Sequence, residues 1–501
     1  MSALLPLLLS LLASVSSQAL APAQVSEFLV TETLSLPTAS GAELLLVPAE
    51  TVELQVEYGP AGTRQRTRIG PRWAPGGQAA RFSLGGLAPS TEVAYRVLVR
   101  PVGVGATRWQ ARPEQTFSTL RREDELVTFA FGPDSHLYQL WIDSVFSAKP
   151  KPLNLFKATL DNMADDEGLD FLVLGGDHAT THCADCVGGT VDGQVYAPDS
   201  AVTFDQARLR YLKLLEPDHL GRVTGSLPFV WVLGNHEGET APSVGNCVHS
   251  DQLSKASRGA RRALLPSPPA IYDSNEEASY YALRSGDALV VVLDVMRFNP
   301  LLPKFADEWT LGEEQLTWLA ETLQQSDARW RFIAAEHLLG GIKGNILHCY
   351  HYGRGGLRAT DDGTPRGTFK GEQALLQELM ELSTPEGGAS FFMTGHDHVA
   401  LPPTEKFDQA GVGSRVFYLK GGTIGRAPGS WKFDDKFQNQ MDWNEDGEAD
   451  YWNDIDGSVR RGYWRISVLG KQAVQFDYVV TDLDDPLING SLLLSRTISA
   501  P

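Results

Sequence analysis

The stretch FLVLGGDH, at residues 171–178, indicates the fold of the larger part of this chain. Four apolar residues run directly into two glycines and then into Asp177, which is typical of a short buried strand that ends in a tight turn. In a parallel α/β sheet, the residues just past the carboxyl ends of the strands line the crevice in which ligands bind. The position of Asp177 therefore predicts a carboxylate at that edge of a sheet.

Four further strings repeat this pattern of an apolar run joined to polar residues. PDSH follows the run at 126–131, GNHE the run at 229–233, AAEH ends the run at 331–335, and GHDH follows the run at 391–393. With GGDH they supply these carboxylate, amide and imidazole side chains: Asp134, His136, Asp177, Asn235, His236, His337, His396 and His398. We expect them to converge on one edge of one sheet.

Such a set of side chains suits a pair of metal ions. A carboxylate can bridge two cations, while imidazoles and an Asn carbonyl fill the other positions without adding charge, and Zn, Fe and Mn accept this mixture of oxygen and nitrogen. Two ions about 3.5–4 Å apart can hold a phosphoryl oxygen and activate water. Each residue alone has a simpler interpretation, as a hydrogen-bonded core His or a turn-forming Asp or Asn. Their joint occurrence at the strand ends favours the metal centre.

In their order and spacing, the five strings resemble the calcineurin-like metallophosphoesterase family. With the β-rich region that precedes them, the chain is most similar to the purple-acid-phosphatase-type branch of that family. The resemblance covers residues 126–482, and residues 25–120 more weakly. It implies an α/β fold, a four-layer α/β/β/α sandwich, preceded by an all-β domain.

The resemblance also implies roles for individual residues, position by position. One metal would be held by Asp134, His136, Asp177 and His398, and the other by Asp177, Asn235, His337 and His396, so that Asp177 is the bridge. His236 resembles the family's non-ligand histidine, which contacts the phosphate and can donate a proton to the leaving group. The implied activity is hydrolysis of phosphate monoesters by direct attack of a metal-bound hydroxide. A phosphodiesterase would share every ligand, and a non-catalytic calcium-dependent surface or binding protein is the alternative from another class.

One position departs from the purple enzymes. These have a Tyr three residues after the bridging Asp and no His in the first motif, whereas this chain has Thr180 and His136. Without the phenolate, no purple Fe(III) charge-transfer band is expected. The identity of the two divalent or trivalent ions, Zn, Fe or Mn, is left open.

Composition restricts the class of protein. The 501 residues, 42% apolar and 21% charged, suffice for two or three globular domains. The net charge of −19 argues against a nucleic-acid surface. The small phosphate ester that the resemblance implies as the substrate would have to be bound by local cations or metals. The oligomeric state is left open.

The ends of the chain suggest its organisation. The apolar run within residues 1–19 resembles a secretory signal, which predicts a secreted or periplasmic protein, and no later run is long enough for a transmembrane anchor. Residues 25–120 contain strand candidates and a turn followed by Tyr95, which resembles the corner of a fibronectin type III sandwich. An irregular β-extension of the next domain is the alternative. In the second domain, residues 125–482, strand candidates alternate with helix candidates at 203–215, 312–325 and 372–382. This domain contains an acidic insertion at 431–458, and residues 483–501 are expected to form a C-terminal tail.

Three weaker signals lie in loops. The cysteines Cys183, Cys186, Cys247 and Cys349 predict disulfides on the rim of the site, with Cys183–Cys186 and Cys247–Cys349 preferred, or a structural zinc site with neighbouring histidines. In the acidic insertion, Asp442, Asn444, Asp446 and Asp450 fall at positions 1, 3, 5 and 9 of a calcium loop, although position 12 is Asn453; a solvated loop is the alternative. Lys343, His351 and Arg354, among glycines after His337, form either a substrate-gripping or a merely solvated loop.

Overall fold

The computed structural model describes residues 28–103, 108–136, 150–179, 189–191, 194–196, 203–239, 250–265, 279–299, 310–337, 372–396, 400–404, 415–425 and 461–501. Several predictions lie outside these residues: the export signal at 1–19, Thr180, His398, the four cysteines, the loop with Lys343, His351 and Arg354, and the acidic insertion with Asp442, Asn444, Asp446 and Asp450. Among the described helices, none combines the length and the apolar character needed to cross a bilayer.

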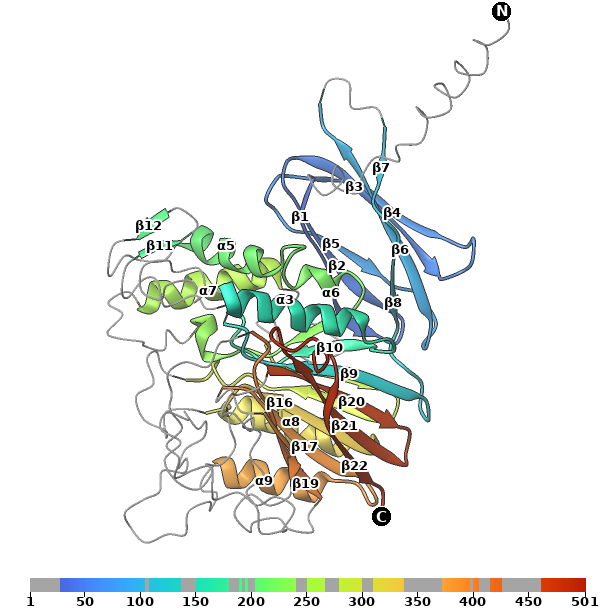
Figure 1. Cartoon of the computed structure of the whole chain (residues 1–501), viewed down its shortest axis with the longest axis vertical. Coiled ribbons are helices and arrows are strands. Elements are labelled where there is room, and N and C mark those ends of the chain that lie inside the picture. The colour runs from blue at the N-terminus through green and yellow to red at the C-terminus, as the bar shows by residue number, and fades with distance from the viewer. Residues whose placement is uncertain are drawn as a thin grey trace, which may run out of the picture.

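A nine-stranded sheet forms the first half of the α/β body (Figure 1). In spatial order its strands are β22 (Leu492–Ser499), β21 (Ala473–Thr481), β20 (Arg461–Leu469), β9 (Leu126–Gly132), β10 (Phe171–Leu174), β13 (Phe229–Trp231), β1 (Leu29–Thr38), β2 (Gly41–Pro48) and β5 (Ala80–Leu84). The strands β9, β10, β13 and β1 are parallel neighbours, whereas the outer strands on both sides pair antiparallel. The expected tail at 483–501 thus contains β22, an edge strand of this sheet.

A six-stranded sheet forms the second half. Its order is β14 (Tyr281–Ser285), β15 (Ala288–Val292), β16 (Trp330–Ala335), β17 (Ala389–Thr394), β19 (Val416–Gly421) and β18 (Ala400–Thr404). The four central strands β15, β16, β17 and β19 are parallel, and both edge strands are antiparallel. Every residue of these four central strands is buried, including the few polar ones, and this burial agrees with their mainly apolar sequences.

The two sheets pack face to face through aromatic side chains. Phe129 of β9 contacts Phe332 of β16 edge-on, with ring centroids 5.1 Å apart, and Phe391 of β17 contacts Phe476 of β21 at 4.9 Å. The opposite face of β16 carries Ile333, which belongs to the core shared with the helices. The central strands therefore bury both faces, and this is why their sequences do not alternate between apolar and polar residues.

Helices cover the outer faces of this body (Figure 1). The helices are α3 (Pro150–Asp165), α5 (Phe204–Leu214), α6 (Gly221–Thr224), α7 (Ser250–Leu264), α8 (Gly312–Gln325) and α9 (Glu372–Ser383). Thr203 is the N-cap of helix α5 and forms a capping box with Gln206. A short hairpin pairs β11 (Gly189–Val191) with β12 (Gln194–Tyr196). The mixed α/β architecture is confirmed, and the complete α/β/β/α layer order stays a prediction.

The N-terminal region is a β-sandwich, as predicted. One of its sheets contains β4 (Thr67–Ala74), β3 (Val52–Pro60), β6 (Glu92–Pro101), β7 (Gln110–Ala111) and β8 (Gln115–Ser118). It packs on β1, β2 and β5 through a core that includes Leu44, Leu54 and Phe82. That second sheet is continuous with the nine-stranded sheet, because β1 pairs parallel with β13 at Ser35 and Phe229. The sandwich is therefore joined to the α/β body by backbone hydrogen bonding.

Side chains also cross this junction. The hydroxyl of Tyr95, expected to anchor a corner of the sandwich, donates instead to the Gly225 carbonyl of the α/β body at 2.7 Å. Arg81 of β5 donates to three carbonyls at the end of α7, those of Arg262, Ala263 and Leu265, at 3.1 to 3.2 Å. These contacts tie the sandwich to the segments that precede and follow β13.

Candidate metal centre

The described members of the predicted ligand set lie just past the carboxyl ends of parallel strands. Asp134 and His136 follow β9, Asp177 follows β10, Asn235 and His236 lie in a short 3-10 helix, η2 (Asn235–Glu237), after β13, His337 follows β16, and His396 follows β17. The prediction of a single sheet was wrong, because the first three strands belong to the nine-stranded sheet and the last two to the six-stranded sheet. Apolar runs buried on both faces do not reveal which sheet a strand joins.

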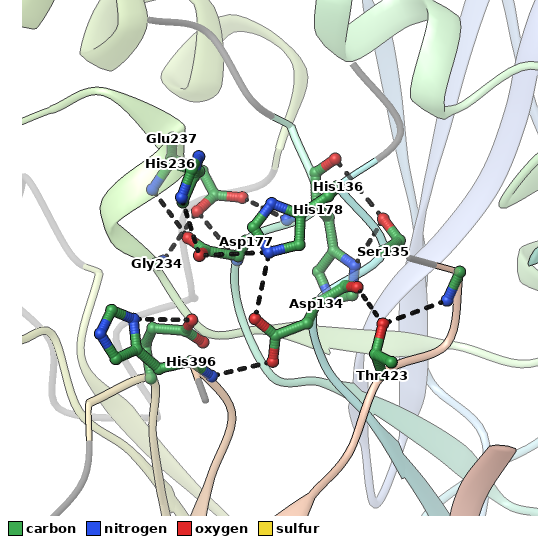
Figure 2. Close-up of polar contacts among 12 residues, drawn as sticks. Asp134, Ser135, His136, Asp177, His178, Gly234, His236, Glu237, His396 and Thr423 are labelled. Atoms are coloured by element: carbon green, nitrogen blue, oxygen red, sulfur yellow. Dashed lines mark hydrogen bonds and ion pairs between the residues drawn. The ribbon is translucent and has the colours of Figure 1, made fainter. Parts of the chain in front are cut away.

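One group of possible ligands gathers around Asp177. The Nε2 atoms of His136 and His236 lie 3.6 Å and 3.7 Å from Asp177 Oδ2, and the two imidazole rings meet edge-on at 4.5 Å (Figure 2). His136 Nε2 also lies 3.3 Å from Asp134 Oδ1. Asp177 is 1% exposed, whereas the His236 side chain is 14% exposed, so His236 is the member of this group that faces solvent.

The carboxylates of Asp134 and Asp177 are hydrogen-bonded to the backbone in the same way (Figure 2). The backbone N–H of His236 donates to Asp177 Oδ1 at 2.7 Å, and that of His396 donates to Asp134 Oδ2 at 2.9 Å. In each case the other oxygen is the one that lies close to the imidazole of His136. One oxygen is thus held by the backbone, and the other is directed into the centre as a ligand would be.

A second group lies on the other side of Asp177. Oxygen or nitrogen atoms of Asp177, Glu336 and His396 lie within 4.8 Å of one another, and His396 Nδ1 is 3.9 Å from Glu336 Oε1. The ring of His337 meets that of His396 at 4.6 Å. Glu336 was absent from the predicted set. Burial, together with the charges of Asp134, Asp177 and Glu237, raises the pKa of Glu336 well above its usual value.

These residues fit metal ions. Ligand atoms bind zinc at about 2.0–2.2 Å, so two donors on one ion lie roughly 3–3.6 Å apart. His136 Nε2 and Asp177 Oδ2, which both belong to the predicted ligand set, lie 3.6 Å apart, at the limit of this range and too far apart for a hydrogen bond. Asn235 Oδ1 is buried and has no hydrogen-bond partner among the described residues. Burying such an acceptor is costly unless something binds it, and a cation would also offset the repulsion among the carboxylates.

Glu237, the last residue of GNHE, organises the loop that carries Asp177. Its buried carboxylate accepts four backbone N–H groups at 2.8 to 3.1 Å, those of Asp177, His178, Ala179 and Gly234. Burial raises the pKa of Glu237, and these four donors act in the opposite direction. The sequence analysis missed this role because a Glu beside a ligand string carries no signal of which backbone groups it will meet.

The backbone at the centre is unusual. Asp134, His136, Asp177 and His396 have φ angles of +58°, +45°, +53° and +73°, in the left-handed region that non-glycine residues seldom adopt. Gly234 is required for another reason, since a Cβ there would overlap Asp177 Oδ1. The paired hydrogen bonds of Asp134 N to Gly176 O and of His136 N to Asp177 O, both 2.9 Å, hold two of the loops against each other.

Comparison with known families identifies the chain. A model of the PhoD-like phosphatases matches residues 145–401, which is just over half of the sequence. The chain belongs to the PhoD-like phosphatase family. The match includes Asp177, Asn235, His236, His337 and His396, whereas Asp134 and His136 precede it and reach the centre from β9. A sequence search of curated proteins found no match.

Solved phosphatase structures share the fold. The structure of PhoD is similar with a TM-score of 0.62 and 17% identity, over 94% of this chain and 88% of that chain. A purple acid phosphatase, PPD1 from seeds of yellow lupin (Lupinus luteus), is similar with a TM-score of 0.56 and 14% identity, over 93% and 74%. The predicted resemblance to metallophosphoesterases of the purple-acid-phosphatase type is confirmed. This PhoD-like phosphatase is a metal-dependent phosphoric ester hydrolase.

Besides Glu336 and Glu237, His178 acquires a definite place in this phosphatase. His178 directly follows Asp177 in the string GGDH. It is buried, its Nδ1 lies 3.1 Å from Ser135 Oγ, and its ring packs against Trp231 at 5.2 Å. Burial lowers its pKa to about 3. His178 is therefore a packing residue beneath Asp177 that links the loops after β9 and β10.

Proposed function

We propose that this phosphatase hydrolyses phosphate monoesters at a centre of two metal ions. The ligands would be Asp134, His136, Asp177, Asn235, His337, His396 and His398, with Asp177 shared. The observation that supports this proposal is the position of Asp177, whose oxygens lie within one donor group with His136 and His236 and within another with Glu336 and His396. Zn, Fe and Mn suit these oxygen and nitrogen donors.

Different residues of the centre would have different roles in hydrolysis. Bound ions would polarise the phosphoryl oxygens and activate water. Asp134 and Asp177 are positioned for ions by backbone N–H groups, so they need not reorganise when ester binds. His236, the partly exposed imidazole of the centre, would donate a proton from a ring nitrogen to the departing alcohol oxygen.

The wider organisation is part of the same proposal. The signal-like residues 1–19 would direct export to the periplasm or the outside of the cell. The sandwich would be of the fibronectin type III kind and the α/β body a four-layer α/β/β/α sandwich. Export is tested by N-terminal sequencing of the mature protein from the extracellular or periplasmic fraction, where an intact residue 1 would contradict it.

Metal analysis combined with two substrates tests the activity. The purified protein should contain two ions per chain and hydrolyse p-nitrophenyl phosphate faster than bis(p-nitrophenyl) phosphate. Preference for the diester would support a phosphodiesterase of the same fold. Two bound metals with no turnover of either ester would contradict hydrolysis of simple esters and favour a binding protein.

Replacing the shared ligand tests the assignment of Asp177. Asp177→Asn should reduce turnover to background and lower metal content, because an amide carries no charge to place between two cations. Metal is measured by elemental analysis and folding by circular dichroism. Near-wild-type turnover would remove Asp177 from its bridging role.

A further inference from the structure

The carboxylate of Glu336 lies inside the centre without an assigned role. Glu336 is 0% exposed, and neither of its oxygens accepts a hydrogen bond from a donor among the described residues. Glu336 is the first residue after β16, so it lies at the strand end, as the other candidate ligands do. A buried carboxylate without donors is costly to the fold unless a cation binds it.

The neighbours of Glu336 are themselves candidate ligands. Its oxygen lies within one group with atoms of Asp177 and His396, all within 4.8 Å, and Oε1 is 3.9 Å from His396 Nδ1. A Cβ on Gly176 or on Gly395 would overlap or crowd Glu336 Oε2, and Gly395 precedes His396 as Gly176 precedes Asp177. The two glycines leave the room in which this carboxylate approaches the ligand-bearing loops.

We propose that Glu336 is a direct ligand of the metal ion held between Asp177 and His396. This inference rests on the proposed two-metal function and adds a second carboxylate to one of its positions. That position then has the oxygens of Asp177, Glu336 and Asn235 beside the imidazoles of His337 and His396. A site richer in carboxylate suits Mn²⁺ better than a site of imidazoles does, whereas Zn²⁺ tolerates both.

The alternative role of Glu336 is a neutral carboxylic acid that donates a hydrogen bond to Asp177. A Gln at this position separates the two roles, because its amide can donate to Asp177 but binds a cation poorly. Glu336→Gln should therefore lose affinity for one ion per chain if Glu336 is a ligand, and should keep both ions if it is a donor.

The test measures metal binding rather than activity. Metal-free full-length protein is titrated with Mn²⁺ and, separately, with Zn²⁺, and bound metal is counted by elemental analysis after dialysis. The wild type should bind two Mn²⁺ ions, and Glu336→Gln should weaken one of them by more than about 10-fold, the smallest loss usual for groups that support a metal site. The loss should be larger for Mn²⁺ than for Zn²⁺.

Asp294→Asn is the matched control. Asp294 is also buried just past a strand end, after β15, but its Oδ1 accepts the backbone N–H groups of Met296 and Arg297 at 2.7 and 3.1 Å. It should bind both ions as the wild type does. Wild-type Mn²⁺ affinity in Glu336→Gln would overturn the proposal.

A structure of the Mn²⁺-loaded wild-type protein decides the question even if the variant does not fold. A Glu336 oxygen about 2.0–2.2 Å from an ion is the expected result, and one beyond about 3 Å from both ions would overturn the proposal. The outcome is independent of activity. If the protein bound two ions, one of them through Glu336, but hydrolysed no ester, only the proposed function would be contradicted. If it hydrolysed esters while Glu336 bound neither ion, only this inference would be contradicted.

Discussion

The candidate ligands hold a conformation that their own residue types disfavour. Left-handed φ angles at Asp134, His136, Asp177 and His396 each cost about 1 kcal/mol or more relative to extended or helical backbone. The surrounding structure must therefore impose them, and hydrogen bonds between loops provide the means. One such bond is donated by Thr423 Oγ to the Asp134 carbonyl at 2.6 Å. These hydrogen bonds hold the ligand-bearing loops against one another.

Glu237 is the residue on which the Asp177 loop depends most. Glu237→Ala would leave four buried backbone N–H groups without their acceptor, so Asp177 should lose its fixed position. We expect metal affinity to fall by about 10–100-fold, measured by titration of the metal-free protein. Glu216→Ala, which alters a half-buried carboxylate remote in sequence from the five strings, is the control. Unchanged metal affinity in Glu237→Ala would refute the positioning role.

Replacing His236 tests whether its imidazole donates a proton to the leaving group. His236→Ala should slow hydrolysis of alkyl phosphates by about 10²-fold or more, because a poor leaving group needs a proton. Nitrophenyl phosphate, whose phenolate departs unaided, should be slowed much less. The measurement is kcat for both esters at constant metal content, and equal losses on the two substrates would contradict proton donation.

For individual residues, the sequence predicted the polar side chains at the strand ends well, but it did not predict which other side chains would lie beside them. Asp177, Asn235 and His337 could be found because each stands where an apolar run stops. Glu336 is equally close to a strand end, but AAEH was interpreted through its His. Its role depends on Asp177, which belongs to the other sheet, and the packing of two sheets is invisible in a local pattern.

Among the elements, the strands with continuous apolar sequence were predicted most accurately. Strand β10 and helix α8 have the predicted bounds, and β9, β16 and β17 differ by one to a few residues. Strands β1 and β22 were missed for different reasons. Strand β1 buries Thr31 and Thr33, so its polar residues disguise a buried strand. Strand β22 is an edge strand with several exposed residues, and its sequence resembles a tail.

The turn after β15 gives a prediction about pH. Burial raises the pKa of Asp294 above its ordinary 3.8, with the Glu239 charge adding to the rise and Ser279 and Arg261 opposing it. The folded state therefore keeps this proton longer than the unfolded state, and the contribution of Asp294 to stability falls as pH rises from about 4 through the raised pKa. Asp294→Asn removes the titration and keeps an acceptor for Met296 N.

The comparison is made by urea unfolding of the metal-free protein between pH 4 and pH 8. The stability of Asp294→Asn relative to the wild type should increase with pH, by at most about 1.4 kcal/mol per unit. The control is Asp218→Asn, since the Asp218 side chain is 75% exposed. A difference independent of pH would show that burial does not shift the pKa of Asp294.

For the whole molecule, the junction between sandwich and α/β body is the feature that sequence could not predict. Composition and turn signals separated residues 25–120 from the rest, because they report local structure. The pairing of β1 with β13 joins residues almost two hundred positions apart, Ser35 and Phe229. Only the folded arrangement reveals that two regions with different sequence patterns share one sheet.

Arg81 tests how tightly this junction is held. Arg81→Ala would remove the donor to three carbonyls at the end of α7, where the negative end of the helix dipole favours a cation. We expect a loss of about 1–3 kcal/mol in stability and faster amide hydrogen exchange in the last turn of α7. Exchange in α9 should not change. If α7 exchanged at the wild-type rate, the contact would be structurally unimportant.

The continuity of the nine-stranded sheet affects the solubility that the α/β body would have without the sandwich. Strand β13 is an interior strand, flanked by β10 on one side and β1 on the other. A chain cut after the sandwich would expose the β13 backbone as an open edge, and open edges recruit strands from other molecules. The sandwich thus covers an edge of the α/β body that would otherwise be open, and a phosphatase that begins after residue 120 is expected to self-associate although it still contains Asp134, Asp177 and the other proposed ligands.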